Sequence, residues 1–322
     1  MNICMVGYGM MGVWHSDGLK EADCCLHTIV GRRPEPTREF ASRYGYLKST
    51  IDFSEALSDP EIDAVILAIP SELHVEYALA AVSAGKHTLV EIPIAMNFAD
   101  SERVVAAAKE SGLTLGVVHP LRARREMADL KERVLAGEEE VRHIGGRFFI
   151  HRLTNVGGTG YERSWTDNLL WHHTTHLLDF GLWMLNEPVR QVQSFMPLPH
   201  AKTGVPMEAF IGLETERDQS LVCTGSYCSH EMIFDALIIT DQNSYRLDVM
   251  DDELVTKEGI AKIASQEESC GMVARDFVAS VREERSPLIP GESVLPAMRV
   301  LQEAQDRWDE RHGARSIPGR AI

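Results

Sequence analysis

The sequence predicts an α/β protein in two domains: a doubly wound parallel sheet at the N-terminus, then an α/β domain with a large, open antiparallel sheet. Three observations support this fold class. Strand-like and helix-like segments alternate over residues 1–120, as in parallel sheets with crossover helices. A glycine-rich turn directly follows the first strand-like segment. In residues 121–322, several strand-like segments are separated by polar turns without a helix, which is typical of antiparallel sheets.

The expected elements follow from apolar periodicity and turn residues. In residues 1–120 we expect strands at 2–6, 26–30, 64–69, 88–91 and 114–118, and helices at 38–44, 72–84 and 100–111. In residues 121–322 we expect strands at 148–153, 191–195, 209–214, 221–227, 236–240 and 244–248, and helices at 272–283 and 292–309. The domain boundary is expected at residue 120. The sequence leaves open whether the C-terminal helix packs back on the first domain.

The composition disfavours several classes of partner. The formal net charge of −16 argues against nucleic acid and anionic membranes, because both bind basic surfaces. No apolar run is long enough to cross a bilayer, and the N-terminal residues read as a buried strand rather than a signal peptide. The six cysteines form no CxxC pair, as expected for reduced thiols. We therefore expect a cytoplasmic protein that acts on a small molecule.

The glycine-rich turn reads GYGMMG and lies between a strand and a helix, which is the context of a dinucleotide-binding turn. Gly7 permits the tight turn, Gly9 lets the backbone approach a pyrophosphate, and Gly12 allows close packing of helix on strand. Met10 and Met11 open the helix, whose N-terminus then faces the phosphates. The alternative is a glycine turn without a ligand.

The residues after the second strand indicate which nicotinamide nucleotide binds. NAD enzymes usually have an acidic residue there, which holds the ribose 2′-hydroxyl. This chain has Arg32 and Arg33 instead. Guanidinium groups attract a 2′-phosphate and bind it through paired hydrogen bonds, so these residues predict NADP. The alternative is that both are solvated loop charges, which leaves NAD open.

Further motifs give the chain a family resemblance. Together with the glycine turn, the segments AIPSELH at 68–74, AGKH at 84–87 and EIP at 91–93 resemble the glucose–fructose oxidoreductase/inositol dehydrogenase/rhizopine-catabolism (Gfo/Idh/MocA) family. The resemblance covers nearly the whole chain. It implies an N-terminal Rossmann domain and a second domain whose open antiparallel sheet often forms a homodimer interface.

The resemblance also implies roles for residues of the first domain. Pro70, Ser71 and His74 are expected near the ribose and phosphates of the cofactor. Glu91 and Ile92 are expected near the nicotinamide. His119 is expected near both the nicotinamide and the substrate.

A narrower resemblance depends on position 92 and on a second motif. The family signature at 91–93 is Glu-Lys-Pro, whose lysine contacts substrate and assists proton transfer, but this chain has Ile92. RSWTD at 163–167 and LLWHH at 169–173, followed by His176 and Asp179, resemble family members that oxidise semialdehydes in aromatic-compound catabolism and also lack the lysine. This implies NADP-dependent oxidation of a dicarboxylate semialdehyde, as its cyclic hemiacetal, to a pyrone.

The segment after RSWTD also reads as a helix that carries three histidines. Thr166 is a suitable N-cap. His172, His176 and Asp179 fall at i, i+4 and i+7 on one face, with His173 rotated from that row. The catalytic interpretation makes His176 the base that takes the hemiacetal proton, with His172 or His173 contacting substrate. Two alternatives stay open: a zinc site, for which no third ligand is evident and which we do not expect, and purely structural histidines.

A dicarboxylate substrate calls for guanidinium groups, which bind carboxylates through paired hydrogen bonds. Arg122 and Arg124 lie just past the last strand of the first domain, where such folds bind ligands. Arg152 stands near the end of the strand expected at 148–153. Each arginine could instead be a surface charge. The residues that we expect to contact substrate are Arg122 and Arg163, as the preferred pair, with Arg124, Trp165, His119 and His173.

Three functions compete. The leading one is an NADP-linked dehydrogenase that forms a pyrone dicarboxylate. The second is a sugar or cyclitol dehydrogenase of the same family, against which Ile92 counts. The third is an NADP-sensing regulatory protein without catalysis, which the missing lysine would suit and the histidine cluster would not.

Overall fold

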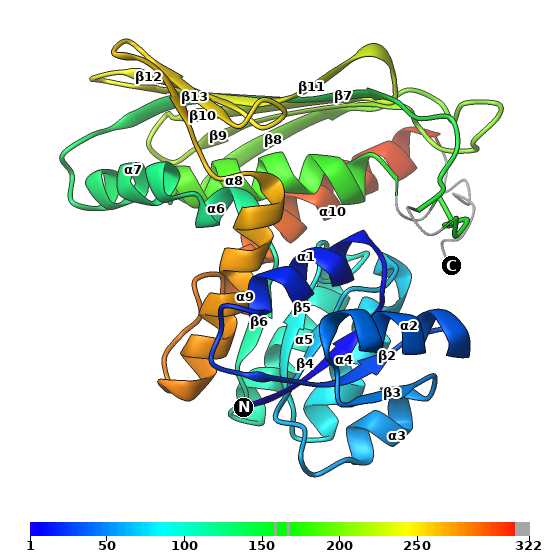
Figure 1. Cartoon of the computed structure of the whole chain (residues 1–322). Helices are drawn as coiled ribbons and strands as arrows, with labels where there is room; N and C mark the ends of the chain where they lie inside the picture. Colours follow the sequence, from blue (N-terminus) through cyan, green and yellow to red (C-terminus); the bar gives the residue numbers. More distant parts are fainter. Residues whose placement is uncertain (158–159, 166–167, 313–322) are drawn as a thin grey trace. The chain divides into compact units, whose positions relative to one another are not determined.

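The structure is a computed structural model, which describes residues 1–157, 160–165 and 168–312 in two compact units (Figure 1). Unit 1 comprises residues 1–120, 156–161 and 267–295, and unit 2 comprises residues 121–155, 162–266 and the chain from 296 onward. The segment 267–295 thus groups with the N-terminal unit, whereas the sequence interpretation assigned it to the second domain.

Unit 1 is built on a six-stranded sheet in the order β3-β2-β1-β4-β5-β6, which is the strand order of a Rossmann fold. All neighbouring strands pair in parallel, which confirms the predicted doubly wound sheet. The strands are β1 (Asn2–Val6), β2 (Cys25–Val30), β3 (Lys48–Thr50), β4 (Ala64–Leu67), β5 (His87–Val90) and β6 (Leu115–Val117). The helices are α1 (Met10–Leu19), α2 (Pro34–Tyr44), α3 (Phe53–Ser58), η1 (Ser71–Leu73), α4 (His74–Ser83), α5 (Phe98–Glu110), α9 (Gln266–Arg282) and η3 (Gly291–Val294).

Helix α9 joins unit 1 through a close crossing with α1. A Cβ atom on Gly18 of α1 would lie 2.3 Å from the Cα of Gly271 on α9, so only glycine allows the two helices this close. The Arg275 guanidinium also donates to the Gly18 carbonyl oxygen at 3.3 Å. Contacts between residues so far apart in the sequence explain why periodicity alone did not assign α9 to this unit.

Unit 2 is built on an eight-stranded sheet in the order β14-β13-β12-β11-β7-β10-β9-β8. Neighbouring strands are antiparallel, except that β7 and β10 pair in parallel, so the sheet is mixed rather than purely antiparallel. The strands are β7 (Val141–His151), β8 (Val189–Phe195), β9 (Glu208–Thr215), β10 (Ser220–Ser226), β11 (Cys228–Thr240), β12 (Ser244–Asp248), β13 (Glu253–Thr256) and β14 (Gly259–Lys262). The helices are α6 (Pro120–Ala123), α7 (Arg125–Leu135), η2 (Leu170–Thr174), α8 (Thr175–Leu185) and α10 (Leu295–His312).

Glycines let α8 and the turn before it pack closely on one face of this sheet (Figure 1). A Cβ atom on Gly146 of β7 would stand 2.8 Å from Cδ2 of Leu177. A Cβ atom on Gly225 of β10 would stand 2.9 Å from Cδ1 of Leu169. The close approach fixes the histidine-bearing helix against β7 and β10.

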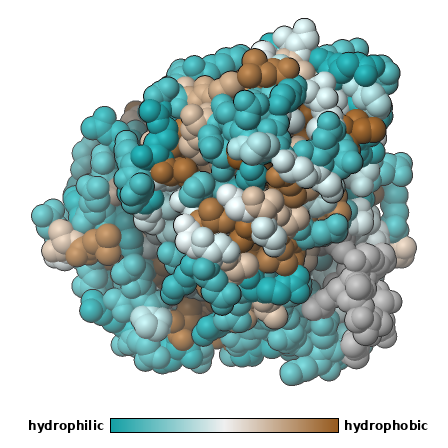
Figure 2. Space-filling view, turned by 90° about the horizontal axis from the view of Figure 1, so that it is seen from below, coloured by the Kyte–Doolittle hydropathy of each residue, from teal (hydrophilic) through white to brown (hydrophobic). Residues whose placement is uncertain are grey.

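No helix within the described ranges combines the length and the apolar character that a membrane span needs. Figure 2 shows one face of the molecule, on which hydrophilic residues predominate and hydrophobic residues occur in separate groups. Scattered apolar residues of this kind are usual on the surface of a globular protein.

Candidate active site

The glycine turn joins β1 to α1 in unit 1 and leaves room for a phosphate. Gly7 has a φ angle of 106°, and a Cβ atom there would lie 2.1 Å from a neighbouring carbonyl oxygen, while one on Gly12 would lie 2.3 Å from the Gly7 oxygen. Around Gly9, no described atom outside its two chain neighbours comes within 4 Å of the Cβ position. Helix α1 begins at Met10 and Met11 without a side-chain cap, so its backbone N–H groups suit the pyrophosphate of a dinucleotide.

Arg32 and Arg33 follow β2 after Gly31, and both are exposed. Strand β2 pairs with β1 beside the glycine turn. The Arg32 guanidinium lies over the ring of Tyr161, 4.3 Å from its centroid. Arg33 Nε donates to the Tyr8 hydroxyl at 3.3 Å. Within the described part of the chain, neither guanidinium forms an ion pair with a carboxylate. The pair can therefore offer its charge to an anion such as a 2′-phosphate.

His74 ties together the segments that follow β4 and β5. The ring is fully buried, with Nδ1 2.7 Å from the Pro93 carbonyl oxygen and Nε2 3.0 Å from that of Ile69. The backbone thus engages both ring nitrogens, which favours a positioning role for His74 over the direct cofactor contact that the resemblance implies. Pro70 is half-buried and Ser71 is buried, and both lie in the turn that His74 holds.

Glu91 is buried and engaged by His15, a residue of α1 that the sequence analysis missed. Oε1 of Glu91 lies 2.7 Å from Nε2 of His15, and Oε2 accepts from the Ile92 N–H at 3.3 Å. Ile92 is buried at the position of the family's lysine and precedes a cis peptide bond. His119 is buried, two residues after the end of β6. A single histidine on a helix, such as His15, gives no sequence signal that it will pair with a distant glutamate such as Glu91.

In unit 2, the three histidines lie where a π-helical turn leads into α8. The Asn168 carboxamide oxygen accepts from the first backbone N–H groups of this turn at 2.9 and 3.3 Å. The Thr174 N–H donates to the carbonyl oxygen of Leu169, five residues back, at 3.0 Å, which is the π-type pattern. The predicted cap Thr166 lies outside the described residues. The helix is therefore irregular where the sequence predicted a regular α-helix.

The three imidazole rings form one cluster. The ring centroids of His172 and His173 are 4.2 Å apart, and those of His172 and His176 are 6.3 Å apart. His173 also stacks on Phe148 at 3.9 Å, and its Nδ1 lies 2.6 Å from the Tyr227 hydroxyl. Burial holds the pKa of His173 well below its usual value, and the neighbouring positive charges add to this effect. His173 is therefore neutral at neutral pH, and it is a weaker base than a histidine with an ordinary pKa.

Arg122 and Asp179 form a buried, bidentate ion pair. Arg122 Nε donates to Oδ2 of Asp179 at 2.7 Å, and Nη2 donates to Oδ1. Arg122 is 2% exposed and Asp179 is 1% exposed. The Arg122 guanidinium carbon also lies 5.8 Å from the centroid of the Trp183 ring. Direct binding of substrate by Arg122 would leave a buried carboxylate without its partner, which is costly. This geometry argues against the predicted substrate contact of Arg122 and makes it a residue that positions α8.

The other predicted substrate residues of unit 2 differ in accessibility. Arg124 is fully buried and donates to Asp252 at 3.3 Å, which argues against a substrate contact. Arg163 and Trp165 are half-buried in the segment before the π turn. The Trp165 ring centroid lies 6.2 Å from that of Tyr227. The structure thus brings Trp165 and His173 together around Tyr227, which the sequence pattern marked only as the last residue of a strand.

A group of metal-ligating type lies elsewhere. Among the described residues, His27, Asp59 and Glu61 of unit 1 are the one set whose ligand atoms all lie within 4.8 Å of one another. The Lys48 ammonium donates to Asp59 at 2.7 Å and to Glu61 at 3.4 Å. That ammonium already supplies the positive charge these carboxylates need.

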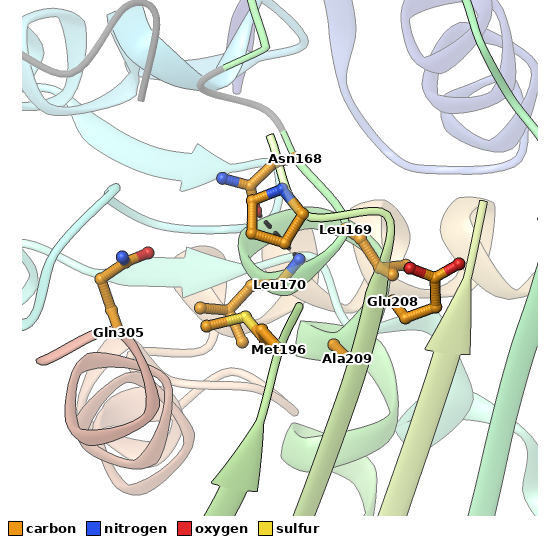
Figure 3. Close-up of a pocket in the computed structure, with 8 residues that line it drawn as sticks. Asn168, Leu169, Leu170, Met196, Glu208, Ala209 and Gln305 are labelled. Carbon is orange, nitrogen blue, oxygen red and sulfur yellow. Dashed lines mark hydrogen bonds between the residues drawn. The ribbon is translucent and has the colours of Figure 1, made fainter. Parts of the chain in front are cut away.

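A small cavity lies beside the start of the histidine helix (Figure 3). Its volume is about 10 Å³, which is room for about one water molecule and too little for a substrate. The residues that line it come from the π turn and the two residues before it, from the loop between β8 and β9, from β9, and from α10: Asn168, Leu169, Leu170, Met196, Pro206, Glu208, Ala209 and Gln305.

Comparison with known proteins agrees with this two-part arrangement. Residues 1–119 match the Gfo/Idh/MocA oxidoreductase family with an NAD-binding Rossmann fold, and residues 127–261 match the C-terminal domain of bacterial oxidoreductases. The chain is 32% identical to 4-carboxy-2-hydroxymuconate-6-semialdehyde dehydrogenase from Sphingobium sp., over 97% of this chain and 100% of that enzyme.

Other relatives match a part of the chain or its fold. The chain is 44% identical over 105 residues to 1,5-anhydro-D-fructose reductase from Ensifer adhaerens, which covers 32% of each chain. The solved structure of levoglucosan dehydrogenase with NADH and levoglucosan superposes with a TM-score of 0.80 at 18% identity, over 95% of this chain and 97% of that one. The chain therefore belongs to the Gfo/Idh/MocA oxidoreductase family and is a nicotinamide-dependent dehydrogenase that acts on a CH–OH group.

Proposed function

We propose that this dehydrogenase oxidises 4-carboxy-2-hydroxymuconate-6-semialdehyde, in its cyclic hemiacetal form, to 2-pyrone-4,6-dicarboxylate with NADP, in protocatechuate 4,5-cleavage. The observation that carries the proposal is the cluster of His172, His173 and His176 in a chain that has Ile92 in place of the family's lysine. The relative that is named for this semialdehyde supports it, since the match spans 100% of that enzyme.

The reaction divides into one hydride and one proton. The hemiacetal carbon loses its hydrogen with the bonding electrons, and the hydroxyl on the same carbon loses a proton, which leaves the lactone carbonyl. Bound NADP supplies the hydride acceptor. His176 takes the proton, because burial and the Tyr227 contact make His173 a poor base. His172 lies against the ring of His173 and orients the hydroxyl by a hydrogen bond.

The preference for NADP follows from Arg32 and Arg33. Both guanidinium groups are exposed beside the glycine turn, and within the described residues neither forms an ion pair with a carboxylate. A 2′-phosphate would give them charge-assisted hydrogen bonds that a 2′-hydroxyl cannot. The expected acidic residue of an NAD enzyme is absent from this position of the sequence.

A second candidate is a sugar dehydrogenase. The 44% identity to 1,5-anhydro-D-fructose reductase over 105 residues favours it. Ile92 argues against it, because the proton transfer of such enzymes uses the lysine that this chain lacks. Substrate profiling therefore has to include neutral sugars.

We also propose that the enzyme works in the cytoplasm as a homodimer through the sheet of unit 2. Phe195, Phe210 and Leu237 are 56%, 40% and 37% exposed. Strand register and side-chain alternation place them on the face opposite α8. Exposed apolar groups on one sheet face are typical of an interface. Sedimentation equilibrium should give twice the chain mass of 35.9 kDa, and a stable monomer would contradict the proposal.

The function is tested by making the semialdehyde in place. Protocatechuate and an extradiol 4,5-dioxygenase generate it in the presence of the purified protein and NADP. We expect NADPH and the pyrone dicarboxylate to form together. We expect little oxidation of myo-inositol with NADP or NAD, and little reduction of 1,5-anhydro-D-fructose with NADPH or NADH. If the semialdehyde yields no NADPH while a neutral sugar is turned over, the second candidate replaces the first.

The role of His176 is tested in the same assay. His176→Ala should lower kcat by about 100-fold or more, which is the usual contribution of a general base, and should leave the Kd for NADP unchanged. His143→Ala is the matched control, because His143 lies on β7 in contact with Ser220 and has no role in the proposed chemistry. An equal loss of kcat in His176→Ala and His143→Ala would make His176 a structural residue. A loss of NADP affinity in His176→Ala that parallels its loss of kcat would lead to the same conclusion.

A further inference from the structure

Three arginines of β7 and its end differ in their partners. Arg142 donates to Glu140 at 2.9 Å, and Arg147 forms a bidentate pair with Asp235. Arg152, which directly follows the strand, has no carboxylate partner among the described residues. It is half-buried, so its positive charge is partly withdrawn from water and is not neutralised by these residues.

Neutral groups hold Arg152 in place. Its Nη2 donates to the Asn155 carboxamide oxygen, and its Nη1 donates to the Tyr227 hydroxyl at 3.4 Å. The guanidinium also lies 5.4 Å from the centroid of the Tyr227 ring. Asn155 is itself fixed, since its Nδ2 donates to the Ser164 carbonyl oxygen at 2.7 Å. The side chain is therefore oriented without the use of its charge.

Tyr227 connects Arg152 to the histidine cluster. Its ring is fully buried, and its hydroxyl lies 2.6 Å from Nδ1 of His173. A hydroxyl that accepts from Arg152 can donate its own hydrogen to Nδ1, and a neutral imidazole then carries its hydrogen on Nε2. Burial first, and then the charges of His172 and Arg152, hold the pKa of His173 below its usual value, in agreement with a neutral ring that donates.

We propose that Arg152 and the Nε2–H of His173 bind one carboxylate of the substrate, in a carboxylate corner made of Arg152, Asn155, Tyr227, His173 and Trp165. Charge-assisted N–H donors are the groups that recognise a carboxylate. The Trp165 ring, 6.2 Å from that of Tyr227, offers an apolar face to a flat unsaturated acid. The corner therefore selects acids over neutral sugars, and this selection rests on the proposed dicarboxylate substrate.

The kinetic test compares two arginines of the same region. Arg152→Met should raise KM for the semialdehyde by about 10- to 100-fold and change kcat little, since the corner binds and does not transfer the proton. Arg152→Lys should recover part of the loss, because the ammonium keeps the charge and loses the planar fork. Arg142→Met, which removes an exposed ion pair with Glu140, should leave both constants unchanged.

A binding test separates this inference from the proposed function. Calorimetry with 2-pyrone-4,6-dicarboxylate and NADP needs no turnover. Binding to the native protein that Arg152→Met weakens by a similar factor would support the corner, even if the semialdehyde were not oxidised. Equal binding to both proteins, or an equal loss in Arg142→Met, would overturn it. If thermal melting shows that Arg152→Met does not fold, Arg152→Lys is the deciding variant. In that variant, an unchanged KM for the semialdehyde and an unchanged Kd for the pyrone dicarboxylate would overturn the inference.

Discussion

At the scale of residues, Arg32 is a side chain that we propose selects NADP over NAD. Its guanidinium is exposed beside the glycine turn and lies 4.3 Å from the Tyr161 ring centroid. Such a cation–π contact contributes about 0.5–1 kcal/mol at an exposed site. It orients the guanidinium and leaves its N–H groups available to an anion.

Arg32→Ala should therefore weaken the binding of NADP far more than the binding of NAD. We expect the Kd for NADP to rise by about 10-fold or more, which is the range for a lost hydrogen bond to a charged group, with the Kd for NAD nearly unchanged. Fluorescence titration with both nucleotides measures this. Arg38→Ala is the matched control, because Arg38 lies on α2 and pairs with Glu35. A uniform loss for both nucleotides would contradict the 2′-phosphate role.

The histidines show that identical residue types take different roles through their neighbours. The His173 ring stacks on Phe148 and its Nδ1 lies within hydrogen-bonding distance of the Tyr227 hydroxyl, whereas His74 is held by two backbone carbonyl oxygens. His15 is engaged by Glu91. Motifs in the sequence point to His74 and His173, but they do not separate a positioning role from a chemical one, because that distinction depends on contacts made across the fold.

At the scale of elements, the Arg122–Asp179 pair connects α6 to α8. Both residues are buried, so the pair cannot be treated as a weak surface contact. Removing one partner of a buried ion pair is strongly destabilising, whereas replacing both by apolar residues is often tolerated. The pair therefore acts on the stability and orientation of the histidine helix.

Asp179→Asn should lower the free energy of unfolding of unit 2 by about 3–5 kcal/mol. The double variant Arg122→Met/Asp179→Leu should recover much of this loss, since no buried charge is left without a partner. Urea unfolding followed by circular dichroism measures both. Asp218→Asn is the matched control, because the Arg190–Asp218 pair is exposed and should change stability by at most about 1 kcal/mol. Equal losses in the single and double variants would contradict this account.

At the same scale, the elements that sequence patterns missed are those with weak apolar periodicity. The buried strands β1, β4 and β5 read as apolar runs because a parallel sheet covers both their faces. Strand β3 is largely polar and β14 is exposed throughout, so neither produces such a run. Strand β7 begins at Val141 rather than at the predicted position 148, because charged and glycine residues interrupt its first half.

At the scale of the whole molecule, the lowered pKa of His173 makes the free energy of unfolding depend on pH. Unfolded histidine has a pKa of about 6.5, whereas burial lowers the pKa of His173 in the folded chain. Between these two values the unfolded chain binds more protons, so acidification favours unfolding. The contribution of neutral His173 to the free energy of unfolding is fully present above about pH 6.5. It is lost as the pH falls toward the pKa of His173 in the folded chain.

His173→Phe should therefore flatten the decline of stability below neutrality. The difference in slope between the native protein and the variant should approach about 1.4 kcal/mol per pH unit, the value for one proton. Urea unfolding between about pH 5 and pH 7.5 measures it across the pKa of unfolded histidine. His143→Ala is the control, as His143 is half-buried on β7. Identical slopes in the native protein and His173→Phe would contradict the lowered pKa.

The sequence by itself determined the parallel sheet, the glycine turn, the arginine pair after β2 and the histidine-bearing segment. These features are local, because apolar runs, glycines and short motifs act within a few neighbouring residues. Only the tertiary structure decided the pairs His15–Glu91, Arg122–Asp179 and His173–Tyr227, whose members lie 76, 57 and 54 residues apart. No local pattern encodes which distant side chain will neutralise or engage a group, since packing of whole elements makes that choice. For this reason the buried pair argues against a substrate contact of Arg122, and Arg152 is the arginine that we propose binds the substrate.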